Sequence, residues 1–378
     1  MIDARYVRGK ESGIGQYVRA LIERLPALAP TSSFRIWTHP ELPQPVLASN
    51  ISCLPLAAPA DGLRTLLTPA GLDALGPRDV IHFPFSLLGR GLPCATIVTI
   101  HDLMWLEQPE LVDHRPWMRR LRQSFYQQGM RWALAHATRI IAVSESTAER
   151  IRAVAPRSSE RVRMTYNAAS SAFTPAERMA DAAEKSAAIL GSAAPYYLVV
   201  GKNEPYKAHQ IALRAFAQAA QADELLVLVQ RTGSGTGLLK LAEELGVTRR
   251  LRWLPNLSAG ELVTVLQSAR ALLQPSIVEG FGIPALEAMA CGCPVVASDT
   301  PALVEVLGGA GLHAKVGDAA ALAAALARLR EGTIRESLRQ KGLERARAFS
   351  WERTAADTLE IYREAAGAGP NRTGKAPS

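Results

Sequence analysis

The second half of the chain repeats one pattern, in which a short apolar run is followed by a segment of helical periodicity. The apolar runs occupy residues 196–200, 225–229, 251–254, 271–274 and 294–298. Each run has the length of a strand rather than of a helix. Because parallel strands need a crossover connection, usually a helix, this rhythm predicts a parallel sheet with helices on both faces.

The first half shows similar apolar runs at residues 80–85, 96–100, 139–144 and 162–167. Between about residues 173 and 195 the sequence becomes alanine-rich and polar, as in a linker with one helix. A chain of 378 residues also exceeds the size at which one hydrophobic core usually stops growing. We therefore predict an α/β protein with two doubly wound domains in tandem, over residues 1–175 and 190–350. A helix over 351–368 and a disordered tail over 369–378 complete the expected organisation.

The start of the chain is short for such a sheet, because only Met1 and Ile2 precede "DARYVRGKESG". We expect the natural protein to carry a few more residues there. Gly13 and Gly15 then form a turn before the helical segment "QYVRALIERL". Glycines at the carboxyl end of a strand let the backbone approach a ligand closely. A tight helix-entry turn without a ligand is the alternative.

Bulk composition excludes several classes of protein. No window approaches the ~20 apolar residues of a membrane span, and the first residues lack the apolar stretch of a signal peptide. We therefore expect a cytoplasmic protein. The four cysteines lack the paired spacing of zinc ligands, so we interpret them as packed thiols and expect no metal site. They are Cys53, Cys94, Cys291 and Cys293.

The net charge of +8 suggests an anionic partner, and residues 115–139 concentrate part of it. This segment, "RPWMRRLRQSFYQQGMRWALAHATR", holds six arginines and no acidic residue among aromatic and aliphatic residues. Such a basic amphipathic helix can lie on an anionic membrane surface, with Arg119, Arg120 and Arg122 among its cations. Equally, it can be a domain helix with its apolar face in the core. Nucleic acid is not expected, since no nucleic-acid-binding module is recognisable.

The stretch "SIVEGFGIPALEAM", residues 276–289, follows a predicted strand and begins a helix at Pro284. Gly280 and Gly282 leave the backbone amides of Phe281, Gly282 and Ile283 pointing outward. Amides at a helix N-terminus suit a phosphate or a sugar hydroxyl.

Two carboxylates flank this turn, Glu279 before it and Glu287 in the helix. Both can face the carboxyl edge of the sheet and accept hydrogen bonds from pairs of hydroxyl groups on a sugar or ribose. The alternative is a capped helix with two surface glutamates.

A second candidate segment is "VVGKNEPYKAHQ", residues 199–210, directly after the first strand of the second domain. Lys202 and Lys207 flank a loop where α/β sheets present ligands. Two ammonium groups beside a helix N-terminus can bind a diphosphate and stabilise an anionic leaving group without a metal ion. The chain contains no D-x-D sequence of the kind that chelates a divalent ion on a diphosphate.

Together these segments resemble glycosyltransferase family 4, the retaining enzymes of GT-B fold, along nearly the whole chain. The segment "EGFGIPALE" resembles the family's E-x7-E motif, and "EAMACGCPVVAS" continues its pattern. Similarly, "VGKNEPYK" is similar to its diphosphate loop and "SGIGQYV" to its N-terminal glycine loop. The segment "TIHDLMWLEQPE" resembles the one that carries an active-site histidine, here His101.

The resemblance implies two Rossmann-like domains facing a cleft, with the C-terminal helix crossing back to the first domain. It implies that Glu287 binds the ribose hydroxyls and Glu279 the transferred sugar, while the two lysines bind the diphosphate. The backbone around Leu254 would meet the base, and His101 would contact the donor sugar. Same-face attack, in which the departing phosphate oxygen takes the acceptor's proton, would retain the anomeric configuration.

The same resemblance implies that the chain moves a hexose from a nucleotide-sugar donor to a saccharide or lipid-linked saccharide acceptor in bacterial polysaccharide or glycolipid assembly. A lipid-linked acceptor would place this cytoplasmic protein peripherally on the inner face of the plasma membrane. A GDP-sugar, GDP-mannose in particular, is favoured over a UDP-sugar by likeness to bacterial mannosyltransferases of polysaccharide assembly. No cofactor is expected. The alternative is a non-catalytic nucleotide-sugar-binding protein. A Rossmann oxidoreductase does not fit, because no strand-to-helix turn carries G-x-G-x-x-G with an acid ~20 residues later.

Overall fold

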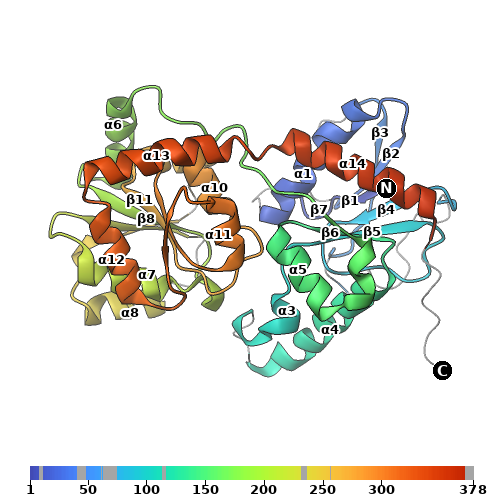
Figure 1. Cartoon of the computed structure of the whole chain (residues 1–378), viewed down its shortest axis with the longest axis horizontal. Coiled ribbons are helices and arrows are strands. Elements are labelled where there is room, and N and C mark those ends of the chain that lie inside the picture. Colours follow the sequence, from blue (N-terminus) through green and yellow to red (C-terminus); the bar gives the residue numbers. More distant parts are fainter. Residues whose placement is uncertain are drawn as a thin grey trace. The chain divides into compact units, whose positions relative to one another are not determined.

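A computed structural model describes residues 1–7, 12–40, 48–60, 62, 75–112, 116–230, 236–255 and 257–370, with the backbone alone for 116–119 and 236. The chain forms two compact units (Figure 1). Unit 1 comprises Met1–Asn167 with Ser350–Ser378, and unit 2 comprises Ala168–Phe349. The predicted tail lies outside the described residues from 371 onward.

Unit 1 contains a parallel sheet of seven strands in the order β3-β2-β1-β4-β5-β6-β7. The strands are β1 Ile2–Asp3, β2 Phe34–Thr38, β3 Ile51–Pro55, β4 Val80–Phe83, β5 Ala95–Ile100, β6 Arg139–Ala142 and β7 Val162–Met164. The strand order reverses between β1 and β4, the position where doubly wound sheets bind ligands at their carboxyl edge.

The helices of unit 1 connect these strands. They are α1 Gly13–Leu28, α3 Met104–Glu107, α4 Pro116–His136, α5 Glu145–Val154 and α14 Trp351–Ala368, with 3-10 turns at Pro109–Leu111 and Pro156–Arg161. The strands β5 and β6 are buried except at Arg139, because helices cover both sides of the sheet.

Unit 2 contains a parallel sheet of six strands in the order β10-β9-β8-β11-β12-β13. The strands are β8 Tyr196–Val200, β9 Leu225–Val229, β10 Leu251–Leu254, β11 Ala271–Gln274, β12 Val295–Ser298 and β13 Leu312–Ala314. The order reverses between β8 and β11, so the segments after these two strands meet at the switch point. Two doubly wound parallel sheets were predicted, and this prediction is confirmed.

The helices of unit 2 include one in the predicted linker and others between the strands. They are α6 Met179–Leu190, α7 His209–Ala219, α8 Thr236–Glu244, α9 Ala259–Ser268, α10 Ile283–Ala290, α11 Pro301–Leu307, α12 Ala319–Arg328 and α13 Gly332–Ala346, with 3-10 turns at Pro205–Lys207 and Thr248–Arg250. A core of Val, Leu, Ala and aromatic residues fills the space between α7, α8, α12 and the sheet.

The C-terminal helix α14 belongs to unit 1. Ile361 and Ala365 pack on Ala95, Ile97 and Ile141 of the sheet. Among the described helices, none combines the length and the apolar content that a membrane span requires.

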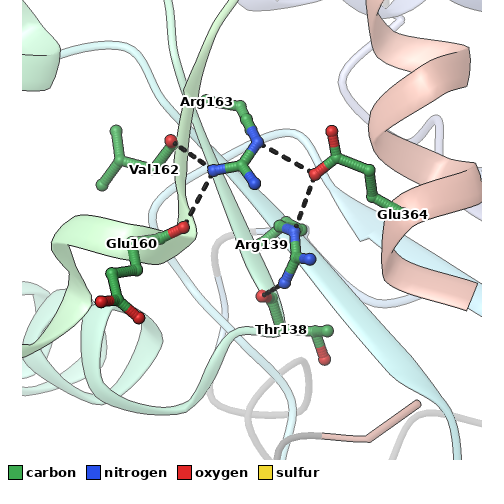
Figure 2. Close-up of polar contacts among 6 residues, drawn as sticks. All are labelled: Thr138, Arg139, Glu160, Val162, Arg163 and Glu364. Carbon is green, nitrogen blue, oxygen red and sulfur yellow. Dashed lines mark hydrogen bonds and ion pairs between the residues drawn. The ribbon is translucent and has the colours of Figure 1, made fainter. Parts of the chain in front are cut away.

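Polar contacts also hold α14, and Figure 2 shows the most prominent one. Glu364 of α14 accepts hydrogen bonds from Arg139 of β6 at 3.1 Å and from Arg163 of β7 at 2.9 Å, both through one carboxylate oxygen. Deeper in the unit, the Tyr362 hydroxyl lies 2.7 Å from Nδ1 of His82. The helix therefore completes unit 1 although it follows unit 2 in the sequence.

Candidate functional site

The switch point of unit 2 brings together the two segments that the sequence singled out. The segment after β8 turns through Gly201 and the 3-10 turn Pro205–Lys207 into α7. Ala208 closes this turn with φ of 49°, a left-handed conformation that is uncommon for a residue with a side chain. The amide of Ile277, in the segment after β11, donates to the carbonyl of Tyr206 at 2.7 Å. The lysine loop and the glutamate motif thus form one structure.

Glu279 is the centre of a hydrogen-bond network at this point. Its Oε1 accepts from the Lys207 ammonium at 2.5 Å, from the Ser276 hydroxyl at 2.8 Å and from the Gln274 amide at 2.9 Å. Within the described part of the chain, no donor contacts its other oxygen, Oε2. The carboxylate is therefore fixed through one oxygen, and the second can still accept a hydrogen bond.

The two predicted phosphate-binding lysines have different surroundings. Lys207 is ion-paired with Glu279, and its ammonium also lies 5.2 Å from the ring centroid of Tyr206. Lys202 is exposed and has no ion-pair partner among the described residues. Charge at Lys202 is thus free for an anion, whereas charge at Lys207 is shared with a carboxylate.

The helix α10 carries the second glutamate. Glu287 is only 5% exposed, and the Glu279 side chain 9%, so the alternative of two surface glutamates is wrong. Gly282 caps α10 with φ of 107°, and a Cβ there would lie 2.6 Å from Cδ2 of Leu303, so only glycine fits. Gly280 and Phe281 are buried beside it.

The N-terminus of α10 offers unpaired donors. In the described residues no acceptor contacts the backbone amides of Gly282 and Ile283. Orphan amides and the positive end of the helix dipole favour an anionic or oxygen-rich ligand. The sequence-predicted donors and the fixed carboxylate therefore lie in one motif of unit 2.

Leu254, predicted to meet a base through its backbone, is the last residue of β10. Its carbonyl accepts from the amide of Gln230 at 3.3 Å. It thus ends a strand at the carboxyl edge of the same sheet, two strands from β8.

In unit 1, His101 follows β5 and is half-buried. Its Nε2 lies 3.0 Å from the carbonyl of Pro84, and a carbonyl can only accept, so Nε2 carries the proton. Burial lowers the pKa of His101 to about 4, although the bond to Pro84 opposes this shift. The ring is therefore neutral at pH 7, and Nδ1 is left as a hydrogen-bond acceptor. The rings of Tyr17 and His101 are in T-shaped contact at a centroid distance of 5.3 Å.

The predicted glycine loop forms the N-terminus of α1. Ser12 caps the helix by accepting from the Gly15 amide at 3.1 Å, and Gly13 is exposed. A Cβ on Gly15 would lie 2.9 Å from the carbonyl oxygen of Tyr6, so close packing of helix on backbone requires this glycine. The helix-entry role accounts for Gly15, and Gly13 remains open to a ligand.

The predicted basic helix is α4, Pro116–His136. Tyr126, Met130 and Leu134 are buried in the core of unit 1, as the domain-helix alternative required. Leu121 is 75% exposed and Arg120 is exposed beside it. The side chains of residues 116–119 lie outside the described residues. Arg120 and Leu121 thus lie on the surface of α4 in the part of its first half whose side chains are described.

Sequence reasoning missed three structural features of these sites. Gln274 and Ser276 hold Glu279, and their signal was a polar residue ending the apolar run 271–274 and a serine before the motif.

In unit 1, Arg5 forms a bidentate ion pair with Asp3, at 2.6 and 2.8 Å, with each residue only 1% exposed. Arg5 also donates to the carbonyl of Ala58 at 2.9 Å, which fixes the chain as it leaves β1.

The cysteines are free thiols. Cys94, Cys291 and Cys293 are buried, and burial raises the pKa of each. Among the described residues, no three His, Cys, Asp or Glu side chains are grouped so as to hold a metal ion.

Comparison with known families gives two matches that divide the chain. The family model "Glycosyl transferases group 1" matches residues 183–348, and "Glycosyltransferase Family 4" matches residues 12–172. The first spans the two candidate segments of unit 2, and the second spans the glycine loop and His101.

Curated relatives carry glycosyltransferase names. "D-inositol 3-phosphate glycosyltransferase" of Salinispora tropica is 38% identical over 183 residues, 44% of this chain and 37% of the relative. The chain thus covers less than half the length of that relative. "O-antigen chain mannosyltransferase B" of Escherichia coli is 30% identical over 292 residues, 75% of this chain and 74% of the relative.

Solved structures share the fold. Sucrose-phosphate synthase of Thermosynechococcus elongatus has a TM-score of 0.72 at 22% identity, over 97% of this chain and 98% of that chain. Anabaena HepE in complex with UDP-glucose has a TM-score of 0.64 at 16% identity, over 97% of both chains. At these identities the likeness concerns the fold alone.

Proposed function

The chain belongs to glycosyltransferase family 4, and from this premise we propose that it is a retaining hexosyltransferase that uses a nucleoside-diphosphate sugar. The observation that carries the proposal is Glu279 at the switch point of unit 2, fixed through Oε1 and open at Oε2. A carboxylate oxygen held open at this edge can accept a hydrogen bond from a hydroxyl of the transferred sugar.

The donor's nucleotide is bound by the rest of the motif. Glu287 accepts from the ribose hydroxyls, and the backbone at Leu254 meets the base. Lys202, which is exposed and without an ion-pair partner in the described part of the chain, contacts the diphosphate together with Lys207. The amides of Gly282 and Ile283 add hydrogen-bond donors.

The reaction breaks the bond between the anomeric carbon and the phosphate oxygen. Lys202 and Lys207 stabilise the negative charge that develops on the departing diphosphate, and no metal ion is required in this scheme. The acceptor hydroxyl attacks from the face that the diphosphate leaves, and the departing phosphate oxygen takes its proton, so the configuration is retained. Neutral His101 accepts a hydrogen bond at Nδ1 from a hydroxyl of the donor sugar and holds it in place.

Mannose is the favoured sugar, with GDP-mannose as donor, because the Escherichia coli relative is named a mannosyltransferase. UDP-sugars are the next candidate donors. The acceptor is a saccharide or a lipid-linked saccharide in bacterial polysaccharide or glycolipid assembly. A lipid-linked acceptor also gives the exposed part of α4 a role, as a peripheral contact with the anionic inner face of the plasma membrane.

A panel of nucleoside diphosphates and their sugars tests the proposal. A ligand at 100 times its dissociation constant adds ~2.7 kcal/mol to stability, which a thermal-shift assay detects easily. We expect nucleotides of one base to stabilise the protein, both as the nucleoside diphosphate and as the nucleotide sugar. When acceptors are added, the nucleotide sugar that stabilises the protein should release its nucleoside diphosphate. A protein that no nucleotide or nucleotide sugar stabilises would contradict the assignment.

A further inference from the structure

Gln274 is a buried side chain whose hydrogen bonding is half complete. It ends β11 and is 5% exposed. Its amide nitrogen donates to Oε1 of Glu279 at 2.9 Å, while its amide oxygen is buried and has no partner among the described residues. Buried polar atoms in proteins are nearly always satisfied, and an orphan one destabilises the fold. This unsatisfied oxygen lies directly beside a proposed ligand-binding carboxylate, so a hydrogen-bond donor on a bound ligand would satisfy it.

The orientation of the amide is fixed by its neighbour. Rotating the amide by half a turn would place its oxygen against the carboxylate oxygen of Glu279 and lose the hydrogen bond. The atom of Gln274 that lacks a hydrogen-bond partner among the described residues is thus the buried oxygen. A Cβ on Gly282 would lie 3.6 Å from the amide nitrogen, so the side chain also borders the glycine turn of the motif.

The chemistry of the missing donor follows from the two oxygens that lack a partner among the described residues, one on Glu279 and one on Gln274. Oε2 of Glu279 and Oε1 of Gln274 both accept hydrogen bonds and cannot donate them. Phosphate oxygens are acceptors at pH 7 and would be repelled by this pair. A sugar ring, in contrast, carries neighbouring hydroxyl groups that can each donate one hydrogen.

We propose that Gln274 is a specificity-determining residue that accepts a hydrogen bond from a hydroxyl of the donor's sugar, next to the hydroxyl bound by Glu279. The proposal rests on the function proposed above, because it assumes a nucleotide-sugar donor. Inverting or removing that hydroxyl leaves the buried oxygen unsatisfied, so Gln274 discriminates between sugars that differ at this one carbon. The nucleotide part of the donor does not contact it.

Gln230 provides a matched control. It follows β9, is 2% exposed, and its amide oxygen also has no partner in the described residues. Its amide nitrogen lies 2.6 Å from Nδ1 of His209 rather than on a carboxylate. Methionine is similar in size to glutamine, so either replacement removes a buried amide at little change in volume. Only Gln274→Met removes an acceptor beside Glu279.

The test compares Gln274→Met and Gln230→Met with the wild type, using the donor found in the panel. Calorimetry gives the affinity for the bare nucleoside diphosphate and for the donor. We expect Gln274→Met to bind the nucleoside diphosphate like the wild type and the donor about tenfold more weakly, the loss of one hydrogen bond. The ratio of kcat/KM between epimeric donors should fall by a similar factor in Gln274→Met. Gln230→Met should keep this ratio and also the ratio of donor affinity to nucleoside diphosphate affinity.

An unchanged ratio of donor to nucleotide affinity in Gln274→Met would overturn the inference, as would an equal change in Gln230→Met. If Gln274→Met does not fold, donors that each lack one hydroxyl are tested on the wild type. Two of them must then bind about tenfold more weakly, one lacking the hydroxyl at Glu279 and one lacking the neighbouring hydroxyl at Gln274. A single weakened donor, or uniform binding of all, would overturn the inference. A wild type that binds nucleoside diphosphate and transfers sugar while failing these tests leaves the proposed function intact. A wild type that binds no nucleotide sugar overturns both.

Discussion

Replacing Lys207 by methionine should destabilise unit 2 in the absence of any ligand. The Lys207 ammonium lies 2.5 Å from Oε1 of Glu279, and the two side chains are 17% and 9% exposed. Methionine keeps the length of the side chain but leaves the carboxylate with two neutral donors, Ser276 and Gln274. Loss of one partner costs about 3–5 kcal/mol in a fully buried ion pair and under about 1 kcal/mol in an exposed one. Because this pair is mostly but not fully buried, we expect a loss of about 2 kcal/mol in the unfolding free energy.

A double-mutant cycle isolates this interaction. Glu279→Gln leaves the Lys207 ammonium unpaired, whereas the double variant removes both charges. The double variant should therefore lose less unfolding free energy than the sum of the losses in the two single variants, by at least about 1 kcal/mol. Hydrogen exchange of the amides in Tyr196–Val200 and Ala271–Gln274 reports the unfolding free energy of unit 2 alone.

Lys202→Met is the matched control for this cycle. Lys202 is exposed, so its loss should leave the unfolding free energy within about 0.5 kcal/mol of the wild type. Both lysine variants should bind nucleoside diphosphate more weakly. Additive losses in the cycle, within about 0.5 kcal/mol, would refute the view that Lys207 fixes Glu279.

Three further predictions concern unit 1. Burial lowers the pKa of His82 to about 3 and of His101 to about 4, from 6.5, so below pH 6.5 the unfolded chain binds protons that the folded unit does not. Each histidine then contributes to the unfolding free energy of unit 1 in full above pH 6.5. This contribution falls by up to about 1.4 kcal/mol per pH unit as the pH drops toward the folded pKa. Equal hydrogen-exchange protection of unit 1 at pH 7 and pH 5 would contradict this. Glu364→Gln, in the contact of Figure 2, should cost under about 1 kcal/mol, because this carboxylate is 41% exposed, and less in high salt; a larger, salt-independent loss in urea unfolding would disagree. Changing Arg120 and Arg122 to glutamate should lower co-sedimentation with anionic vesicles at low salt, and unchanged sedimentation would remove the membrane role of α4.

The periodic parts of the fold were predictable because their pattern is local. The runs at 196–200, 225–229, 251–254 and 271–274 coincide with β8 to β11, since each is an apolar run bounded by helical segments. The strands β2 and β3 were not predicted, because Phe34–Thr38 and Ile51–Pro55 mix polar and apolar residues. The helix α13 was also missed as a separate element, because its polar sequence carries almost no apolar periodicity.

The candidate site was predictable in its residue types and not in its contacts. The motif located Glu279, and the loop located Lys207, but neither indicated that the two are paired. That pairing depends on β8 and β11 being neighbours in the sheet, which sequence spacing does not reveal. The role of Gln274 depends on the same adjacency and on the direction of one amide group. Long-range contacts of this kind follow from the assembled sheet.

The two glutamates have different roles in the proposed reaction, and calorimetry with the bare nucleoside diphosphate tests this difference most directly. Glu287→Gln should weaken binding of the nucleotide by about 10- to 100-fold, because a charged hydrogen bond to the ribose is lost. Glu279→Gln should bind the nucleotide as tightly as the wild type or more tightly, since the variant frees Lys207 for the diphosphate, yet it should lose sugar transfer. Equal losses of nucleotide affinity in the two variants would contradict the assignment of Glu279 to the transferred sugar.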